Sequence, residues 1–193
     1  ASFGYTDVKS LGKYNLRERV VESLEKISNL SVRDENSFKT VKELIGIEPE
    51  LHVDPVIVYD FDEYMSKSVP ERDYIIVYSY QGRIADKQMI AAIKDFARIK
   101  GKILIGLYSY YSWCDKNIVA DTPFELLTYF KNADYIVTDT FHGTIFSLKY
   151  NKTFCTILRK SNNNKLSSLL KQFALDDRVV DGPEDIQRLL DKP

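Results

Sequence analysis

Cysteine, glycine and proline are scarce in this sequence of 193 residues, which contains two cysteines, eight glycines and six prolines. Cys114 and Cys155 lie far apart, without a CxxC spacing or a histidine-rich segment nearby. The sequence therefore predicts neither a zinc site nor a disulfide framework, and we expect free thiols in a reducing cytoplasm. The low glycine and proline content also excludes a fibrous or disordered chain.

An excess of charge of either sign is also missing. Lysine and arginine total 27 and aspartate and glutamate 28, so the formal net charge is −1. No long-range field attracts nucleic acid, and an anion must be bound by a local cluster. No apolar run approaches the roughly 20 residues that cross a bilayer, and no leader is evident at the start. We expect a cytoplasmic protein, either free or peripheral to the inner face of the membrane.

Apolar runs and helical spacings alternate through the second half of the chain. Residues 74–78 and 102–108 are strand-like and flank a helical spacing over residues 84–99. The pattern repeats with a helix over 123–131 and then a strand, a helix and a strand, which lie at 135–138, 142–150 and 153–158. Two such β-α-β units predict an α/β fold of the Rossmann-like, doubly wound type, with a mainly parallel sheet.

The first half and the tail are less regular. Helical spacing covers residues 16–27, with Asn15 as the expected N-cap, and a second helix runs from caps at 34–36 to Gly46. Residues 53–59 are β-branched but contain Pro55, which predicts an edge strand. Shorter predicted elements are a strand at 30–32, helices at 166–173 and 183–190, and a strand at 178–180. We expect one domain over residues 1–193. We expect its opening residues, 1–4, to be the end of a strand. We also expect the chain to be an excised part of a longer protein.

The best candidate for chemistry is the segment that follows the strand at 135–138. In an open parallel sheet, ligands bind beyond the carboxyl ends of the strands, where helices begin and present unpaired N–H groups. His142 stands there, and Gly143 would let a ligand approach the backbone. The alternative is that the segment only caps a helix and the histidine is structural. The neighbouring candidates for ligand binding are Asp139, Thr140, Phe141, Gly143 and Thr144.

Two arginines are further candidates. Arg33 lies between a predicted strand and a helix, and its guanidinium suits carboxylate or phosphate. The alternative is a salt bridge to Asp34, Glu35 or a neighbouring helix. Arg159 and Lys165 belong to a polar loop after the last long strand, where they either face a ligand or are solvated surface charges. The other histidine, His52, lies beside Glu50 and is expected at the surface or in packing.

Aromatic residues cluster after the strand at 102–108. Tyr108, Tyr110, Tyr111 and Trp113 would form either a sugar-stacking platform or a loop packed against the core, and the second is favoured because aromatic side chains bury large areas anywhere. The sequence contains no GxGxxG, Walker, HExxH or GxSxG motif. The fingerprints of dinucleotide, nucleotide triphosphate, zincin and α/β-hydrolase sites are thus absent.

Three segments in this order resemble the polysaccharide pyruvyl transferase family: SVRDENS at residues 31–37, HVDPV at 52–56 and ADYIVTDTFHGTIFS at 133–147. The resemblance implies one half of a fold like the two-domain B-type glycosyltransferases, so that this chain is the C-terminal portion and an N-terminal domain of the same polypeptide forms the other wall of a cleft. It implies transfer of a pyruvyl group from phosphoenolpyruvate to two sugar hydroxyls as a ketal, with no cofactor besides this donor.

The resemblance also implies residue roles. His142 matches the essential histidine of the family and Arg33 an arginine that holds the donor, while Phe141 and Gly143 begin the helix that would fix phosphate and carboxylate. Asp139 would orient the imidazole or cap the helix, with the cap favoured. The sequence departs from the family at Thr140, where some members have a basic residue, and at 160–165, where asparagines replace a common arginine.

The acceptor implied by the resemblance is a glycan or lipid-linked sugar of an exopolysaccharide, capsule or cell wall of bacteria, and nucleic acid is not an expected partner. Two other functions remain open. A nucleotide-sugar glycosyltransferase shares the fold, and Glu125, on a helix that starts at Pro123, would then bind the donor ribose. A non-catalytic glycan-binding domain is the other alternative.

Overall fold

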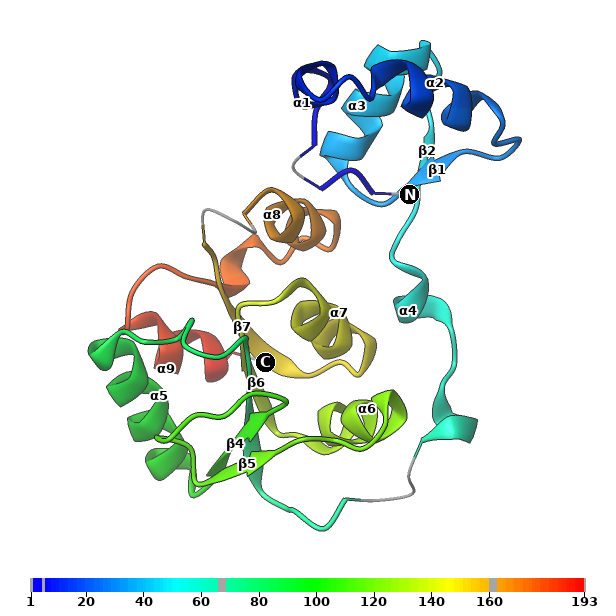
Figure 1. Ribbon diagram of the computed structural model, residues 1–193. Coiled ribbons are helices and arrows are strands. Elements are labelled where there is room, and N and C mark those ends of the chain that lie inside the picture. The colour runs from blue at the N-terminus through cyan, green and yellow to red at the C-terminus, as the bar shows by residue number, and fades with distance from the viewer. Residues whose placement is uncertain (1, 5, 66–68, 160–162, 193) are drawn as a thin grey trace.

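The computed structural model describes residues 2–4, 6–65, 69–159 and 163–192. Its centre is a parallel sheet of six strands in the order β5-β4-β3-β6-β7-β8 (Figure 1). The strands are β3 (Tyr74–Tyr78), β4 (Ile103–Leu107), β5 (Lys116–Ile118), β6 (Tyr135–Thr138), β7 (Thr153–Ile157) and β8 (Val179–Val180). Renumbered from one, this order is 3-2-1-4-5-6, the order of the Rossmann fold. The predicted fold class is confirmed.

Helices cover both faces of the sheet because the strands are apolar on both sides. Ile75 and Val77 of β3 face α5 (Lys87–Lys100) and α9 (Asp185–Leu190). Tyr74 and Ile76 face the opposite side, and this face is covered by α6 (Pro123–Asn132), α7 (Phe141–Lys149) and part of α8 (Asn163–Gln172). Figure 1 shows α5 and α9 on one side of the strands and α6 and α7 on the other.

Chain order reverses between β3 and β6, which lie side by side in the middle of the sheet. β3 continues through α5 toward β4, whereas β6 continues through α7 toward β7. In the register of the pair, Tyr78 lies opposite Thr138, so both strands end at the same level. The loops that leave them must diverge and leave a crevice at this switch point, where Rossmann-like proteins bind their ligands.

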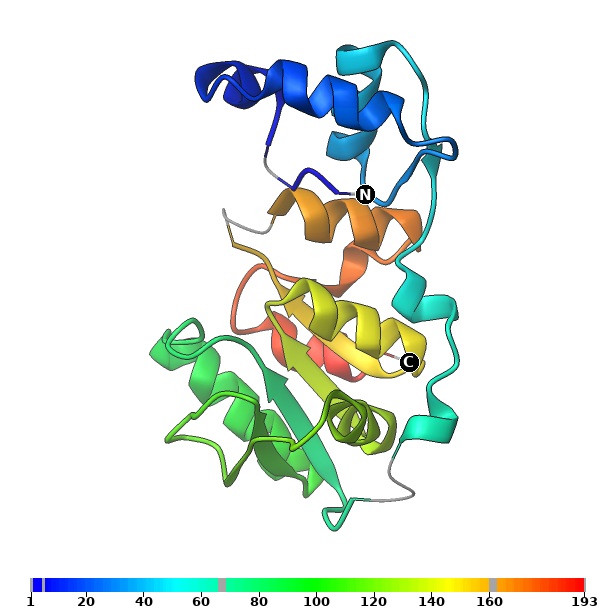
Figure 2. The same ribbon diagram turned by 45° about the vertical axis from the view of Figure 1, so that its right-hand side comes forward.

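The N-terminal residues pack around a hydrophobic cluster of their own. This region contains α1 (Val8–Lys13), α2 (Arg17–Glu25), β1 (Ser31–Val32), α3 (Glu35–Ile45) and β2 (Glu50–Leu51), and β1 pairs with β2 in parallel. Figures 1 and 2 show it beside α8, at the end of the sheet body. The backbone N–H of Glu35 donates to the Ser168 hydroxyl of α8 over 3.3 Å.

Residues 53–59 do not form the predicted edge strand. The segment contains the short helix α4 (Pro55–Val58), in which Pro55 occupies the first turn, where its missing N–H has no helical partner to lose. The carboxylate of Asp54 accepts a hydrogen bond from Val56 N over 3.1 Å and caps the helix. The Asp54-Pro55 pair therefore marks the start of a helix. The prediction of a strand was wrong because it gave more weight to the β-branched residues that follow. The 3-10 turn η1 (Asp62–Tyr64) follows.

Other predicted boundaries also move. Asn15 does not cap α2, because it adopts φ 54° in the turn after α1, an element that the spacing did not indicate. Ser2 and Phe3 lie in no strand. The Ser2 hydroxyl and the Phe3 N–H instead donate to Asp34 and Ser37 at the start of α3. Of the predicted polar loop, residues 160–162 lie outside the described residues, as does residue 1, and α8 already begins at Asn163.

Candidate functional site

His142 lies at the switch point, in the first turn of α7. The strand β6 ends at Thr138, and α7 begins at Phe141 after a turn of two residues. The Thr140 hydroxyl accepts a hydrogen bond from Gly143 N over 2.9 Å and is the N-cap of the helix. Since the helix starts immediately beyond the strand, the His142 side chain lies at the carboxyl edge of the sheet, where it is partly buried but accessible to solvent.

Asp139 does not cap α7, contrary to the favoured prediction. Its side chain is 1% exposed, and Oδ2 lies 2.7 Å from Nε of Arg159, which follows β7. The ion pair links the segments that follow two neighbouring strands, and a buried carboxylate requires such a partner. The cap role passed to Thr140 because a threonine in extended conformation can reach the N–H three residues ahead.

Gly143 and Thr144 serve the packing of α7 against the sheet. A Cβ atom on Gly143 would lie 2.1 Å from the hydroxyl oxygen of Thr138, so the glycine is required for the approach of helix to strand. The Thr144 hydroxyl is fully buried and donates to the Thr140 carbonyl oxygen over 3.1 Å. The space beside Gly143 that was predicted for a ligand is occupied by the Thr138 side chain instead.

Arg33 reaches this region from the N-terminal part of the chain. It forms an ion pair with Asp54, whose side chain is 3% exposed, rather than with Asp34 or Glu35. Its guanidinium carbon lies 5.1 Å from the centroid of the Phe141 ring, a cation–π contact. Phe141 in turn meets the His142 ring edge to face, with centroids 5.8 Å apart. The structure thus brings Arg33 and His142, which are distant in sequence, into contact with the same aromatic ring.

The surroundings of His142 favour its neutral form. Partial burial lowers the pKa of the imidazole below its usual value of 6.5. The Asp54 carboxylate opposes this shift, while Arg33 and Lys165 add to it. His142 therefore carries little charge at neutral pH and can accept a proton. His52, in contrast, is 59% exposed and contacts Glu50 over 2.8 Å, at the surface as expected.

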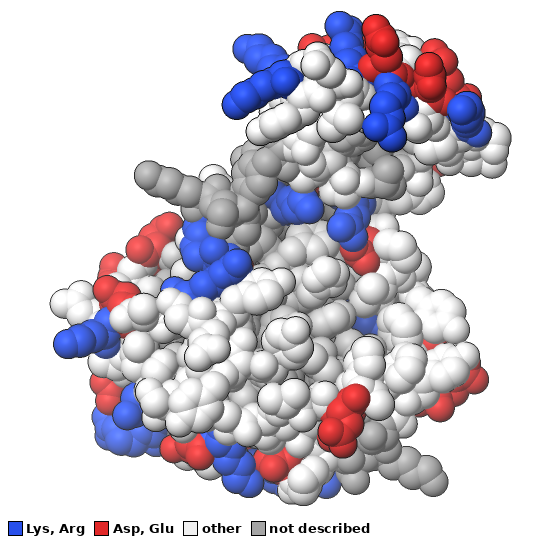
Figure 3. All heavy atoms as spheres, in the orientation of Figure 1, with Lys and Arg blue, Asp and Glu red and all other residues white. Residues whose placement is uncertain are grey.

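Basic side chains gather between the N-terminal region and the sheet body, in the hollow visible in Figure 3. Arg33 and Lys165 are close enough to His142 to influence its pKa, and Lys165 belongs to the first turn of α8. Two positively charged side chains therefore lie near His142 in a chain of net charge −1, and the Asp54 carboxylate offsets the charge of Arg33. Arg159, in contrast, is engaged by the buried Asp139.

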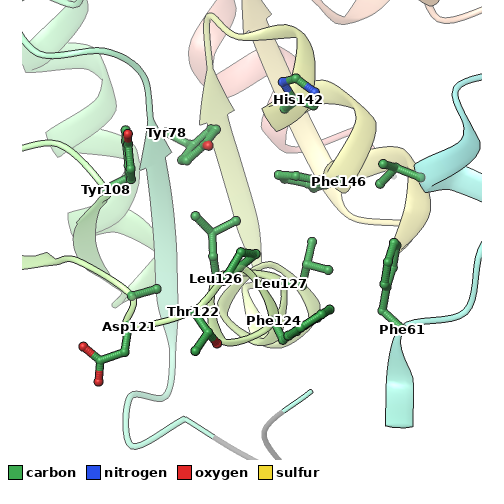
Figure 4. Close-up of a pocket in the computed structure, with 13 residues that line it drawn as sticks. Phe61, Tyr78, Tyr108, Asp121, Thr122, Phe124, Leu126, Leu127, His142 and Phe146 are labelled. Atoms are coloured by element: carbon green, nitrogen blue, oxygen red, sulfur yellow. The ribbon is translucent and has the colours of Figure 1, made fainter. Parts of the chain in front are cut away.

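Two cavities meet at His142. The larger has a volume of about 490 Å³ and the smaller about 120 Å³, and both are lined by Tyr78, Tyr108 and His142. The smaller also contacts Thr140 and Ser79. Figure 4 shows His142 at one end of the larger cavity, with Tyr78 and Tyr108 along one side.

Tyr78 was not among the predicted site residues, and Tyr108 was named only in the sugar-stacking alternative, which was not the favoured one. Tyr78 ends β3 and Tyr108 directly follows β4, so the carboxyl ends of two strands were the signal that could have found them. Tyr108 is 57% exposed and adopts φ 75°, a strained conformation for a bulky side chain. Burial raises the pKa of Tyr78 to about 12, with Tyr80 and Tyr108 adding to the shift, so its phenol stays protonated at neutral pH.

The aromatic cluster after β4 divides into two parts. Tyr111 is buried and packs on Trp113 with ring centroids 5.4 Å apart, which confirms the favoured packed loop for these two. Tyr108 and Tyr110 are exposed, and Tyr108 lines the site.

Glu125 is used in local structure. Its carboxylate accepts from Asp121 N over 2.7 Å, while Thr122 accepts from Glu125 N over 3.1 Å. Together these two bonds stabilise the start of α6, where Thr122 is the N-cap. Glu125, the acidic residue that a ribose-binding role would need, is therefore engaged in local structure.

Within the described residues there is no group of three or more His, Cys, Asp or Glu side chains that could hold a metal ion. Helices in the same part of the chain are too short or too polar to traverse a bilayer. The sequence model of the family described as polysaccharide pyruvyl transferase matches residues 3–161. No curated protein matches the chain.

Proposed function

The chain belongs to the polysaccharide pyruvyl transferase family, and from this premise we propose that it takes part in moving the pyruvyl group of phosphoenolpyruvate onto two hydroxyls of a sugar as a cyclic ketal. The observation that carries the proposal is His142 at the switch point, kept neutral by its surroundings and placed beside the cationic groups of Arg33 and Lys165. The reaction requires a base next to cationic groups that can bind a small polyanion.

The reaction balances without a redox partner. The CH₂ carbon of phosphoenolpyruvate gains a proton and becomes a methyl group, and the first sugar oxygen bonds to the central carbon. The second sugar oxygen then bonds to the same carbon, and the bond between that carbon and the phosphate oxygen breaks. The two hydroxyls release two protons, of which one is matched by the new methyl group and the other by the departing phosphate.

We assign His142 as the base that accepts a proton from an attacking hydroxyl. A lowered pKa increases the fraction of neutral imidazole at pH 7, which is the form that can act as a base. General base catalysis of this kind contributes roughly 10²–10⁴-fold in rate. His142 is exposed at the junction of the two cavities, so substrates can reach it from both.

Arg33 and Lys165 are the proposed anchors for the carboxylate and phosphate of the donor. Arg33 retains N–H groups for hydrogen bonds to an anion besides its contact with Asp54, because a guanidinium carries five N–H bonds. The N-terminus of α7 at Phe141 adds a positive dipole end. Thr140 lines the smaller cavity, whereas Gly143, Thr144 and the Asp139–Arg159 pair hold the frame around it.

The wider setting is also a proposal. The acceptor would be a sugar of an exopolysaccharide, capsule or cell-wall glycan of a bacterium, free or linked to lipid, and the reaction would occur in the cytoplasm or at the inner face of the membrane. The chain would act as one Rossmann-like domain, with an N-terminal domain of the same polypeptide as the other wall of the cleft.

Calorimetric titration of the chain with phosphoenolpyruvate and, separately, with UDP-glucose tests the donor. We expect binding of phosphoenolpyruvate that is lost in the double variant Arg33→Ala/Lys165→Ala, and none of UDP-glucose. Binding of UDP-glucose alone would support a glycosyltransferase, and binding of neither would support a glycan-binding domain.

Transfer itself is measured by the mass gain of an acceptor glycan incubated with phosphoenolpyruvate and the full polypeptide. His142→Ala should abolish the gain and leave the unfolding transition unchanged, because the side chain is exposed. His52→Ala is the matched control, since His52 lies at the surface with Glu50. Activity of His142→Ala within tenfold of wild type would remove His142 from the mechanism.

A further inference from the structure

The larger cavity is mostly apolar, and His142 lies at one end of it. Phe124 and Leu127 of α6, Phe146 of α7 and Val56 of α4 form much of its wall. Asp121 and Thr122 also border it, but Figure 4 shows the Asp121 carboxylate pointing away, and the Thr122 hydroxyl accepts a hydrogen bond from Glu125 N. At about 490 Å³, the cavity has the size of a small-molecule site.

The aromatic part of this wall is held by contacts outside the cavity. Phe124 stacks on Tyr64 of η1, with ring centroids 5.3 Å apart. Phe146 contacts Phe130, in the core, at 5.1 Å and nearly perpendicular. Because these rings are fixed by neighbours from several elements, the cavity exists without its ligand and does not have to be formed by it.

Such a wall is a poor fit for the ring hydroxyls of a bare sugar. A hydroxyl that leaves water for an apolar surface without a new hydrogen bond is penalised. The polar groups near the cavity are concentrated at the other end, on His142 and on the Tyr78 phenol, which is directed toward the side where His142 and Phe146 lie. The occupant is therefore apolar in the cavity and polar at His142.

We propose that this cavity is a subsite for an alkyl or acyl group that the acceptor carries close to its reacting hydroxyls. The inference rests on the proposed function, because it is the acceptor that must bring hydroxyls to His142. The compact anionic donor then belongs outside this apolar cavity, beside His142 and the cationic groups of Arg33 and Lys165. Tyr78, Tyr108 and His142 line both cavities, so His142 is accessible from the apolar cavity as well.

The test compares methyl and octyl glycosides of one sugar, both below the micelle concentration, in binding to the chain without phosphoenolpyruvate. Each buried methylene strengthens binding about three- to fourfold, so the octyl glycoside should bind at least about tenfold more tightly. Ala120 lines the cavity from the loop before α6, and Ala120→Leu would fill part of it. This variant should abolish the preference for the octyl glycoside.

Val119→Leu is the matched control, since Val119 is the neighbouring residue and 74% exposed. It should retain the preference. Equal binding of the two glycosides by wild type would overturn the inference, as would a preference that persists in Ala120→Leu while that variant unfolds at the wild-type temperature. If Ala120→Leu is unstable, the test uses the NMR chemical shifts of the Phe124 and Phe146 rings when octyl glycoside is added to wild type. Shifts that change support the inference, and shifts that do not change overturn it, because the octyl group then binds elsewhere.

The readout is independent of the donor. A preference for the octyl glycoside in a chain that binds no phosphoenolpyruvate would retain the apolar subsite and reject the proposed reaction. Binding of phosphoenolpyruvate without a preference among glycosides would do the reverse.

Discussion

The guanidinium of Arg33 lies over the ring of Phe141, with its central carbon 5.1 Å from the ring centroid. Phe141 is the first residue of α7, whereas Arg33 follows β1 in the N-terminal region. The contact therefore joins the two parts of the chain at the residue that precedes His142. A change at Arg33 is expected to affect the site even when both parts fold normally.

Arg33→Lys should raise the KM for phosphoenolpyruvate by about tenfold or more with a smaller change in kcat. Lysine keeps the charge opposite Asp54 but loses the planar fork that can bind Asp54 and an anion at once. Steady-state kinetics with varied donor checks the split between the two constants. Arg17→Lys, at an exposed position of α2, is the control and should change neither constant. Unchanged constants for Arg33→Lys would favour a purely structural ion pair.

The pKa of His142 should lie below 6.5 and rise when Lys165 is replaced by Gln. Burial is the first cause of the lowered pKa, and the positive charge of Lys165 contributes in the same direction. Removing that charge makes protonation easier. Because the base must be neutral, activity falls as the pH drops through this pKa, and the acidic limb of the rate profile should move to higher pH in Lys165→Gln.

Proton NMR can measure this directly, because the chain has two histidines and His52 provides the reference signal. A titration midpoint of His142 above 6.5 in wild type would contradict the prediction. A midpoint that does not move in Lys165→Gln would show that the charge of Lys165 does not contribute to the lowered pKa.

The regular α/β half was predictable from sequence because its signals are local. Strands such as β3 and β6 are unbroken apolar runs, and the register of parallel neighbours then carries the segments after them to one edge. This placed His142 correctly at the carboxyl end of the sheet. The weak strands β2 and β5 were missed because they are short and carry no apolar run.

Side-chain pairing was not predictable, because it depends on which segments meet in space. Asp139 and Arg159 pair across two neighbouring strands, and Arg33 found Asp54 instead of its neighbours in sequence. Nothing in the spacing of a chain distinguishes a guanidinium that faces a ligand from one that faces a buried carboxylate. For the same reason Gly143, interpreted as space for a ligand, is space for the Thr138 hydroxyl.

Gly143→Ala should destabilise the protein by about 1–3 kcal/mol or more, because overpacking at the junction of α7 and β6 forces the helix away from the strand. The added Cβ would lie 2.1 Å from the Thr138 hydroxyl oxygen. Denaturant unfolding measures the change, and Thr138→Ala in the same chain should recover part of it. Gly12→Ala is the control, since a Cβ there meets nothing within 4 Å and alanine favours the helix. Equal stability of wild type and Gly143→Ala would show that α7 can shift freely.

Tyr78→Phe should lower kcat/KM for transfer by about three- to tenfold, the effect of one neutral hydrogen bond to the substrate. The ring of Tyr78 is held edge to face by Phe130 at 5.2 Å, and its backbone carbonyl accepts from the Thr138 hydroxyl over 2.7 Å, so phenylalanine retains the packing. The unfolding temperature should stay within a few degrees of wild type. Tyr135→Phe removes a hydroxyl from β6 at a ring that packs on Phe96, on the other face of the sheet, and should leave kcat/KM unchanged. A Tyr78→Phe variant with wild-type kinetics would mean that the phenol borders the two cavities without contacting what binds there, and His142 would then be left as the polar group on which the acceptor hydroxyls converge.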